Sequence, residues 1–300
     1  MAGHIEIERG FAENCAGKEL KMFVKSKSLI IIFFISIFFI SCDGGKMAEQ
    51  KVQYDFLNDV SASSWEKLSK KKIYFGHQSV GFNIIEGLKD LMKENPQIKL
   101  NIVETNNLDN FNKGIFAHSR VGKNVDPKSK IEEFAKFTEQ GIGENADIAF
   151  FKFCYVDVRS ETDSQKVFDD YRQSMSNLTK KYPKTTFIHI TVPLRIVQTG
   201  PKAWIKKIIG RPAGGYDDNI KRSEFNELLI KEYDGKETIY DLAKIESTRP
   251  DGTRETFSKD GKTYYAIVPD YTYDGGHLNE TGRKKAAEQL LILLTSLATQ

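Results

Sequence analysis

The chain has 300 residues, of which 40% are hydrophobic and 28% are charged, and its formal net charge is +3. This composition is typical of a globular protein with a substantial core. Acidic and basic residues are interspersed, which gives no reason to expect a nucleic-acid partner. The three cysteines, Cys15, Cys42 and Cys154, are too few and too far apart for a disulfide framework, so the core alone must hold the fold.

The N-terminal region carries the pattern of an export signal. Residues 28–41 are almost wholly apolar and follow two closely spaced lysines. The run is shorter than the roughly 20 residues that a membrane-spanning helix needs, which favours a signal peptide. It ends in Ser41-Cys42, which resembles a bacterial lipobox with Phe39 in place of the usual leucine. Cys42 is therefore the predicted lipidation site; the alternative is an ordinary signal peptide, or a short anchor, with an incidental cysteine.

This pattern predicts how the chain is organised. Signal peptides begin near their basic region, so Met22 is a plausible true start. We expect residues 1–41 to be an upstream extension and signal peptide, and residues 42–60 to be the lipidated cysteine and a polar tether. Residues 61–300 are expected to form the folded domain. An exported protein of this kind would be held in the bacterial cell envelope, on a membrane, by its lipid.

The rest of the chain alternates strand-like and helix-like segments. Strands are predicted at residues 72–75, 98–104, 147–158, 185–192 and 238–242, and helices at 80–92, 127–140, 164–181, 219–233 and 279–297. Such alternation predicts an α/β protein, a three-layer α/β/α sandwich around a parallel sheet of the flavodoxin-like kind. The irregular stretch 194–218 either covers the binding site or is a surface excursion.

A candidate nucleophile lies at the end of the first predicted strand. The chain turns through Gly76 and enters a helix just after Ser79. Chemistry in parallel sheets gathers at the carboxyl ends of the strands, and a serine on such a turn can be exposed near the positive end of the helix dipole. The alternative is that Ser79 merely caps its helix.

A candidate base lies just before the last predicted helix, on a loop rich in glycine. Asp274 and His277 are three residues apart. A carboxylate at this spacing can hold one imidazole nitrogen while the other nitrogen faces a serine. The alternative is a turn that happens to contain a histidine.

Together these segments resemble the SGNH/GDSL hydrolases, over nearly the whole chain from about residue 72 to 297. The most specific match is the stretch Asp274-Gly-Gly-His277-Leu-Asn-Glu-Thr-Gly282. The resemblance implies an SGNH-type α/β fold and a catalytic triad of Ser79, Asp274 and His277. The first motif departs from the usual Gly-Asp-Ser-Leu, because here the glycine is Gly76, one position further from the serine.

The same resemblance suggests which residues bind the oxyanion. The family's second glycine is best matched by Gly122, whose amide would act together with that of Ser79. The family's usual asparagine is missing from the stretch Phe153-Cys-Tyr-Val-Asp157. The sequence leaves Tyr155, Cys154 and a backbone amide open as its replacement, and Asn124 is a further candidate donor.

The other histidines have simpler interpretations. His77 is a competing base, but residues so close on a tight turn reach each other poorly, so we favour His277. His118 is expected in a loop after the second strand, at the pocket or on the surface, and His189 is expected in the core. No cluster has metal-ligand spacing and no glycine-rich phosphate loop is present, so neither a metal nor a cofactor is predicted.

The resemblance implies a serine esterase acting on a small acyl ester or an acylated glycan, with acetyl as the expected acyl group. Carbohydrate at the envelope is the expected setting, by analogy with the fold and the location. Two alternatives stay open. The same triad could transfer the acyl group to a glycan, or the altered motifs could mark a lipoprotein that only binds its ligand.

Overall fold

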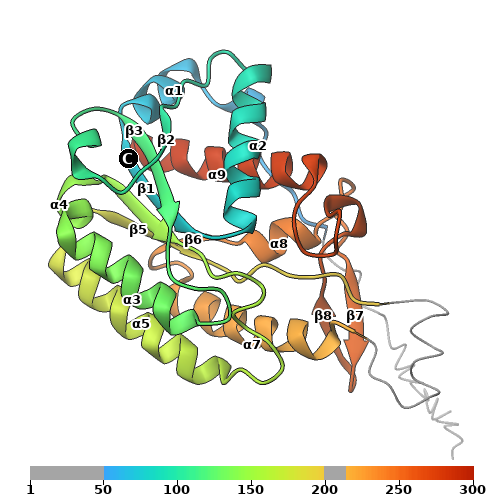
Figure 1. Ribbon diagram of the computed structural model, residues 1–300. Coiled ribbons are helices and arrows are strands. Elements are labelled where there is room, and N and C mark those ends of the chain that lie inside the picture. Colours follow the sequence, from blue (N-terminus) through green and yellow to red (C-terminus); the bar gives the residue numbers. More distant parts are fainter. Residues whose placement is uncertain (1–50, 199–213) are drawn as a thin grey trace, which may run out of the picture. The chain divides into compact units, whose positions relative to one another are not determined.

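The computed structural model of the chain describes residues 51–198 and 214–300 (Figure 1). The predicted signal peptide, Cys42 and most of the tether lie outside these residues. Within the described segments, no helix combines the length and the apolar character that a bilayer span requires.

A six-stranded parallel sheet forms the centre of the domain, in the order β2-β3-β1-β4-β5-β6. The strands are β1 (Lys72–His77), β2 (Ile102–Glu104), β3 (Ile115–Arg120), β4 (Ile148–Phe151), β5 (Thr186–Ile190) and β6 (Thr238–Tyr240). Strands β1 and β4 lie in the middle, and β4 is buried along its whole length. A strand buried on both faces is apolar throughout, as the run at 148–151 is.

Helices cover both faces of this sheet, so the predicted three-layer α/β/α fold is confirmed (Figure 1). One layer contains α1 (Ala62–Ser69), α2 (Val80–Glu94), α8 (Leu242–Ser247) and α9 (Glu280–Thr299). The other contains α3 (Pro127–Phe137), α5 (Ser164–Lys181) and α7 (Tyr216–Tyr233). Each layer packs its apolar side chains into its own core, one on either side of the sheet.

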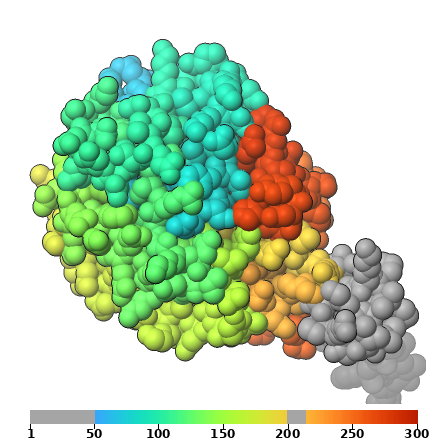
Figure 2. Space-filling model, viewed as in Figure 1, coloured from blue at the N-terminus to red at the C-terminus, as the bar shows by residue number. Residues whose placement is uncertain are grey.

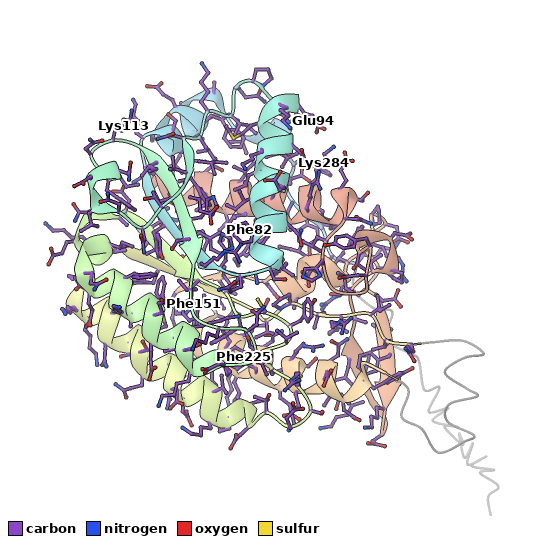
Figure 3. All side chains as sticks on the ribbon, viewed as in Figure 1. Phe82, Glu94, Lys113, Phe151, Phe225 and Lys284 are labelled. Carbon is purple, nitrogen blue, oxygen red and sulfur yellow. The ribbon has the colours of Figure 1, made fainter. Side chains whose placement is uncertain are left out.

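Helices α2 and α9 are in close contact, although they are far apart in sequence. A Cβ atom on Gly87 would lie only 2.2 Å from the carbonyl oxygen of Arg283, so the two backbones nearly touch there. Ion pairs link the helices at their edges, and the Lys284–Glu94 pair spans 2.6 Å (Figure 3). The same two segments meet at the surface, in cyan and red (Figure 2). This contact places the N-terminal ends of both helices, and the loops before them, at one site.

Several elements were not predicted. Strand β3 is the largest omission, because its sequence Ile-Phe-Ala-His-Ser-Arg ends in polar residues, whereas the predicted strand at 98–104 contributes only the edge strand β2. His118 therefore lies within β3 and is buried, not in a loop. Also missing from the prediction were the short helices α1 and α8 and the hairpin of β7 (Thr256–Lys259) and β8 (Lys262–Tyr265).

The described end of the predicted tether packs against the domain. The Val52 amide donates a hydrogen bond of 2.9 Å to the carbonyl of Gly252, and the side chain of Leu57 is buried in the core. The folded part of the chain therefore begins before residue 61.

Candidate active site

Ser79 lies on a sharp turn between β1 and α2. Its φ angle is +42° and its ψ angle is −105°, and a positive φ is rare for a residue with a side chain and often marks a functional site. The Ser79 side chain makes no capping hydrogen bond to the helix, so the capping interpretation fails. The turn is crowded, since a Cβ atom on Gly81 would lie 2.3 Å from the ring of His77. The strained turn exposes the serine hydroxyl at the carboxyl end of the sheet.

The serine, histidine and aspartate form one hydrogen-bonded chain. The Ser79 hydroxyl is in hydrogen-bond contact with Nε2 of His277, and Nδ1 of His277 lies 2.6 Å from an oxygen of Asp274. The other Asp274 oxygen accepts the amides of His277 and Gly276, at 2.8 and 3.0 Å. Partial burial alone would raise the pKa of Asp274, but these hydrogen bonds lower it below its usual value. The carboxylate is thus charged and fixed against the imidazole.

The loop that carries this pair is tied to both neighbouring helices. The amide of Leu278 donates to Asn83 on α2 at 3.1 Å, and Asn279 caps α9 by accepting the Gly282 amide at 3.0 Å. The Thr272 hydroxyl closes the loop by donating to the carbonyl of His277 at 2.6 Å. The sequence folds this way because Asn279 is a good N-cap and the loop's glycines permit its tight turn.

Two tyrosines flank the imidazole. The Tyr155 ring meets the His277 ring edge-on at 5.5 Å, and its hydroxyl lies 3.3 Å from Nδ1 and 3.5 Å from Nε2. Tyr273 stacks on the ring at 5.9 Å and is itself 68% exposed. The imidazole is therefore held in one plane while the site stays open to solvent.

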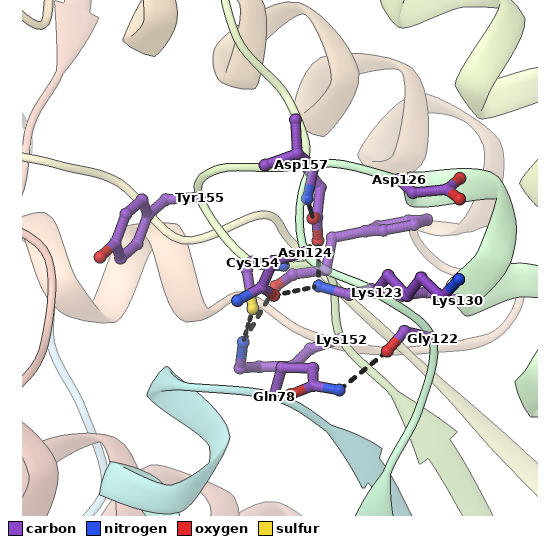
Figure 4. Close-up of polar contacts among 12 residues, drawn as sticks. Gln78, Gly122, Lys123, Asn124, Asp126, Lys130, Lys152, Cys154, Tyr155 and Asp157 are labelled. Carbon is purple, nitrogen blue, oxygen red and sulfur yellow. Dashed lines mark hydrogen bonds and ion pairs between the residues drawn. The ribbon is translucent and has the colours of Figure 1, made fainter.

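The loops after β3 and β4 meet beside the turn that carries Ser79, where the side chain of Gln78 donates to the carbonyl of Gly122 at 2.9 Å (Figure 4). A fully buried ion pair joins α3, which follows the first loop, to the second loop: the Lys130 ammonium lies 2.5 Å from the Asp157 carboxylate. Lys130 also donates to the side-chain oxygen of Asn124 at 3.0 Å. Asp157 accepts the Cys154 amide at 2.6 Å and the Val125 amide at 2.9 Å. The two loops are thus fixed to each other by buried charge.

This arrangement changes the predicted oxyanion site. The amide of Gly122 donates to the carboxylate of Glu133, so it is not open to a substrate oxygen as predicted. The hydroxyl of Tyr155 faces the imidazole. Among the described residues, the Ser79 amide and the side-chain nitrogen of Asn124 have no hydrogen-bond partner. Of the side-chain and backbone donors named from the sequence, these two have no described partner.

His77 is not a competing base. Its ring is buried in β1 and its Nε2 lies 3.0 Å from Nδ1 of His118. Burial, followed by the neighbouring His118, lowers the pKa of His77 to about 2, so it stays neutral. His189 is a core residue as predicted, since it is buried and hydrogen-bonded to Tyr171 and Glu237. Within the described residues, no cluster of histidine, cysteine and acidic side chains could hold a metal ion.

One charged side chain at this site was not predicted. Arg195 lies just beyond β5, with its guanidinium 5.1 Å from the centre of the Tyr155 ring. It stands at the start of the stretch 194–218, which showed no motif. Its place after the strand Thr186–Ile190, at the carboxyl end of the sheet, is the signal that could have identified it.

No family model matches the chain, and no curated protein matches it. Solved structures with a similar arrangement include a GDSL-like lipase from Bacteroides thetaiotaomicron, 14% identical with a TM-score of 0.46, covering 78% of this chain and 89% of that chain. The periplasmic domain of a lipopolysaccharide acetyltransferase from Salmonella ser. Paratyphi A is 13% identical with a TM-score of 0.43, covering 74% and 83%. A peptidoglycan O-acetylesterase is 12% identical with a TM-score of 0.40, covering 62% and 47%. These likenesses concern the fold alone.

Proposed function

We propose that this protein is a serine esterase that removes acyl groups, with acetyl as the expected group, from ester-linked substrates. The observation that carries the proposal is the continuous hydrogen-bonded chain from the Ser79 hydroxyl through His277 to Asp274. A nucleophile in contact with a base, which is itself oriented by an acid, is the arrangement that activates a serine.

In the proposed reaction, the Ser79 oxygen attacks the ester carbonyl as Nε2 of His277 takes the hydroxyl proton. Asp274 stabilises the imidazolium that forms. The amide of Ser79 and the side-chain nitrogen of Asn124 are the donors that we assign to the oxyanion. His277 then gives the proton to the departing alcohol, leaving an acyl group on Ser79. Water, deprotonated by His277, releases the acid and restores the serine.

The proposal extends to the setting of the enzyme. A lipid on Cys42 would hold the domain in the cell envelope, where acylated glycans are available substrates. The experiment for this part is mass spectrometry of the mature N-terminus, and the idea fails if Cys42 carries no diacylglyceryl group. A lipid-anchored form should resist salt washing, since more than one acyl chain binds a membrane firmly.

A fluorophosphonate probe tests the catalytic proposal directly. The wild-type chain should be labelled on the peptide containing Ser79 and should hydrolyse 4-nitrophenyl acetate. Ser79→Ala should lose both, whereas Ser296→Ala, at an exposed serine on α9, should keep both. Labelling elsewhere, or unchanged hydrolysis by Ser79→Ala, would rule out the mechanism. Adding an acetylatable glycan would show whether water or a sugar accepts the acyl group.

A further inference from the structure

Arg195 packs directly against the loop that carries the base. Its Nε donates to the carbonyl of Gly275 at 3.4 Å, and a Cβ atom on Gly276 would lie 3.1 Å from the same nitrogen. A single aromatic ring, that of Tyr155, contacts both the guanidinium and the imidazole of His277. The positive charge of Arg195 is therefore beside the reacting groups.

Most of the hydrogen-bond donors of this guanidinium are unused. An arginine offers five N–H groups, and among the described residues only Nε of Arg195 has an acceptor, at a long distance. No described carboxylate lies within ion-pair distance of it. Arg222, close by, shows the contrast: it is buried and donates to the Tyr155 carbonyl at 2.8 Å and to Asn219 at 2.7 Å, with Asp218 at 3.7 Å.

The backbone of Arg195 is fixed even though its side chain is partly exposed. The Arg195 amide donates to the side-chain oxygen of Asn219 at 3.1 Å, and the Asn219 side-chain nitrogen donates to the Arg195 carbonyl at 2.7 Å. Asn219 is completely buried on α7. Because the backbone of Arg195 is already fixed, only its side chain has to be ordered when the guanidinium binds a ligand, which keeps the entropy cost small.

The surroundings also favour a negative ligand. The charge of Asp274 is directed into His277, and that of Asp157 is matched by Lys130. Arg120, at the end of β3, also lacks a described acidic partner and lies 4.7 Å from the ring of Phe82. Arg195 and Arg120 are thus two positive charges at this end of the sheet that have no described acidic partner.

We propose that Arg195 is a specificity-determining residue that binds a carboxylate on the substrate, so that the enzyme prefers acyl esters of acidic molecules. This inference rests on the proposed esterase function and names its substrate class. The two terminal nitrogens of a guanidinium match the two oxygens of a carboxylate, which gives geometric selectivity as well as attraction. An acetylated sugar that carries a carboxylate belongs to this class.

The test compares 4-acetoxybenzoate with 4-acetoxybenzamide, which are the same acetyl ester with and without a negative charge. Hydrolysis is followed by release of the phenol. Arg195→Gln should lower kcat/KM for the benzoate by roughly 10- to 100-fold, mainly through KM, because a charge-assisted hydrogen bond is lost. For the benzamide the change should stay within about threefold. Arg195→Lys should be intermediate, since it keeps the charge but loses the paired donors.

Arg172→Gln is the matched control, because it removes the same charge from an exposed arginine on α5 that pairs with Asp169. This variant should leave the ratio of kcat/KM for the benzoate to kcat/KM for the benzamide unchanged. If the kcat/KM ratio is also unchanged in Arg195→Gln, whether or not both esters are hydrolysed more slowly, the proposal is overturned and Arg195 has a packing role. If the wild-type chain hydrolyses neither ester, the esterase function itself has failed, which is a separate result.

Discussion

The two sides of Ser79 are built in different ways. On one side, the loop with Asp274 and His277 is held by short local hydrogen bonds, and both side chains remain partly exposed. On the other side, the Lys130–Asp157 pair holds the loop after β4 against α3, and both side chains of the pair are 0% exposed. The groups proposed to act on protons are partly exposed, whereas the loop after β4 is fixed by buried charge.

The difference has an energetic meaning. Burying an ion pair costs desolvation of both groups, and the attraction repays that cost only when the remaining hydrogen bonds are satisfied. Asp157 meets this condition, because it also accepts two backbone amides. Substitutions in the exposed Asp274–His277 loop should therefore lower the reaction rate, and substitutions of the buried Lys130–Asp157 pair should lower the free energy of unfolding. The predictions below test this separation.

The largest effects are expected from the triad. Ser79→Ala and His277→Ala should each lower kcat by roughly 10⁶-fold, because the two act as a unit, while Asp274→Asn should cost less, roughly 10⁴-fold. The measurement is ester hydrolysis together with the unfolding midpoint in urea. The midpoint should shift little in all three variants. A variant of the triad that unfolds much more readily would break the separation between the two sides.

The next largest effect is expected from the buried pair. Lys130→Ala should lower the free energy of unfolding by about 3–5 kcal/mol, because Asp157 is left charged and buried without its partner. Lys128→Ala, on the same helix, is the control. Lys128 lies 3.6 Å from Glu132 and its side chain is 71% exposed, so its loss should cost under about 1 kcal/mol. Equal effects in urea unfolding would show that burial does not distinguish the two pairs.

The difference between the sides also explains what could be predicted from the sequence. The proposed base and acid are close in sequence: Asp274 and His277 are three residues apart in a glycine-rich loop, so the spacing alone predicts the pair. Helix α3 was also predictable, since Asp126 caps it and Pro127 fills its first turn. The pairing of Lys130 with Asp157 depends on how α3 and the loop after β4 meet in space, and no sequence spacing predicts it.

The failures have physical reasons as well. The amide of Gly122 was expected to face a substrate oxygen, but the carboxylate of Glu133, on α3, accepts its hydrogen bond instead. Strand β3 was missed because it ends in the polar residues His118, Ser119 and Arg120, a pattern typical of a loop. In the structure His118 is buried, Ser119 is half-buried and Arg120 is exposed at the end of the strand. Arg195 carries no motif, and its place after β5 was the one signal in the sequence; its contact with Tyr155 is visible only in the structure.

A smaller effect is expected on the pH dependence of stability. The pKa of His77 is lowered to about 2 in the folded state, from 6.5, so the unfolded chain binds more protons at acidic pH. The stability from keeping this ring neutral is full above pH 6.5 and is lost as the pH falls. Between pH 7.5 and pH 5, wild type should lose about 2 kcal/mol more than His77→Gln, as measured by urea unfolding. Parallel losses in both proteins would contradict the neutral assignment.

The smallest effect is expected from the hydroxyl of Tyr155, which lies where the two sides meet. It is 3.3 Å from Nδ1 of His277, but that nitrogen already bonds Asp274 at 2.6 Å, so the hydroxyl adds only a weak contact. Tyr155→Phe should therefore lower kcat by less than about tenfold, because the ring that packs on His277 and Arg195 is retained. Tyr155→Ala should cost more, because it removes that ring. A loss of 10²–10³-fold in Tyr155→Phe, which is typical of a missing oxyanion donor, would instead mean that the hydroxyl turns towards the substrate during the reaction.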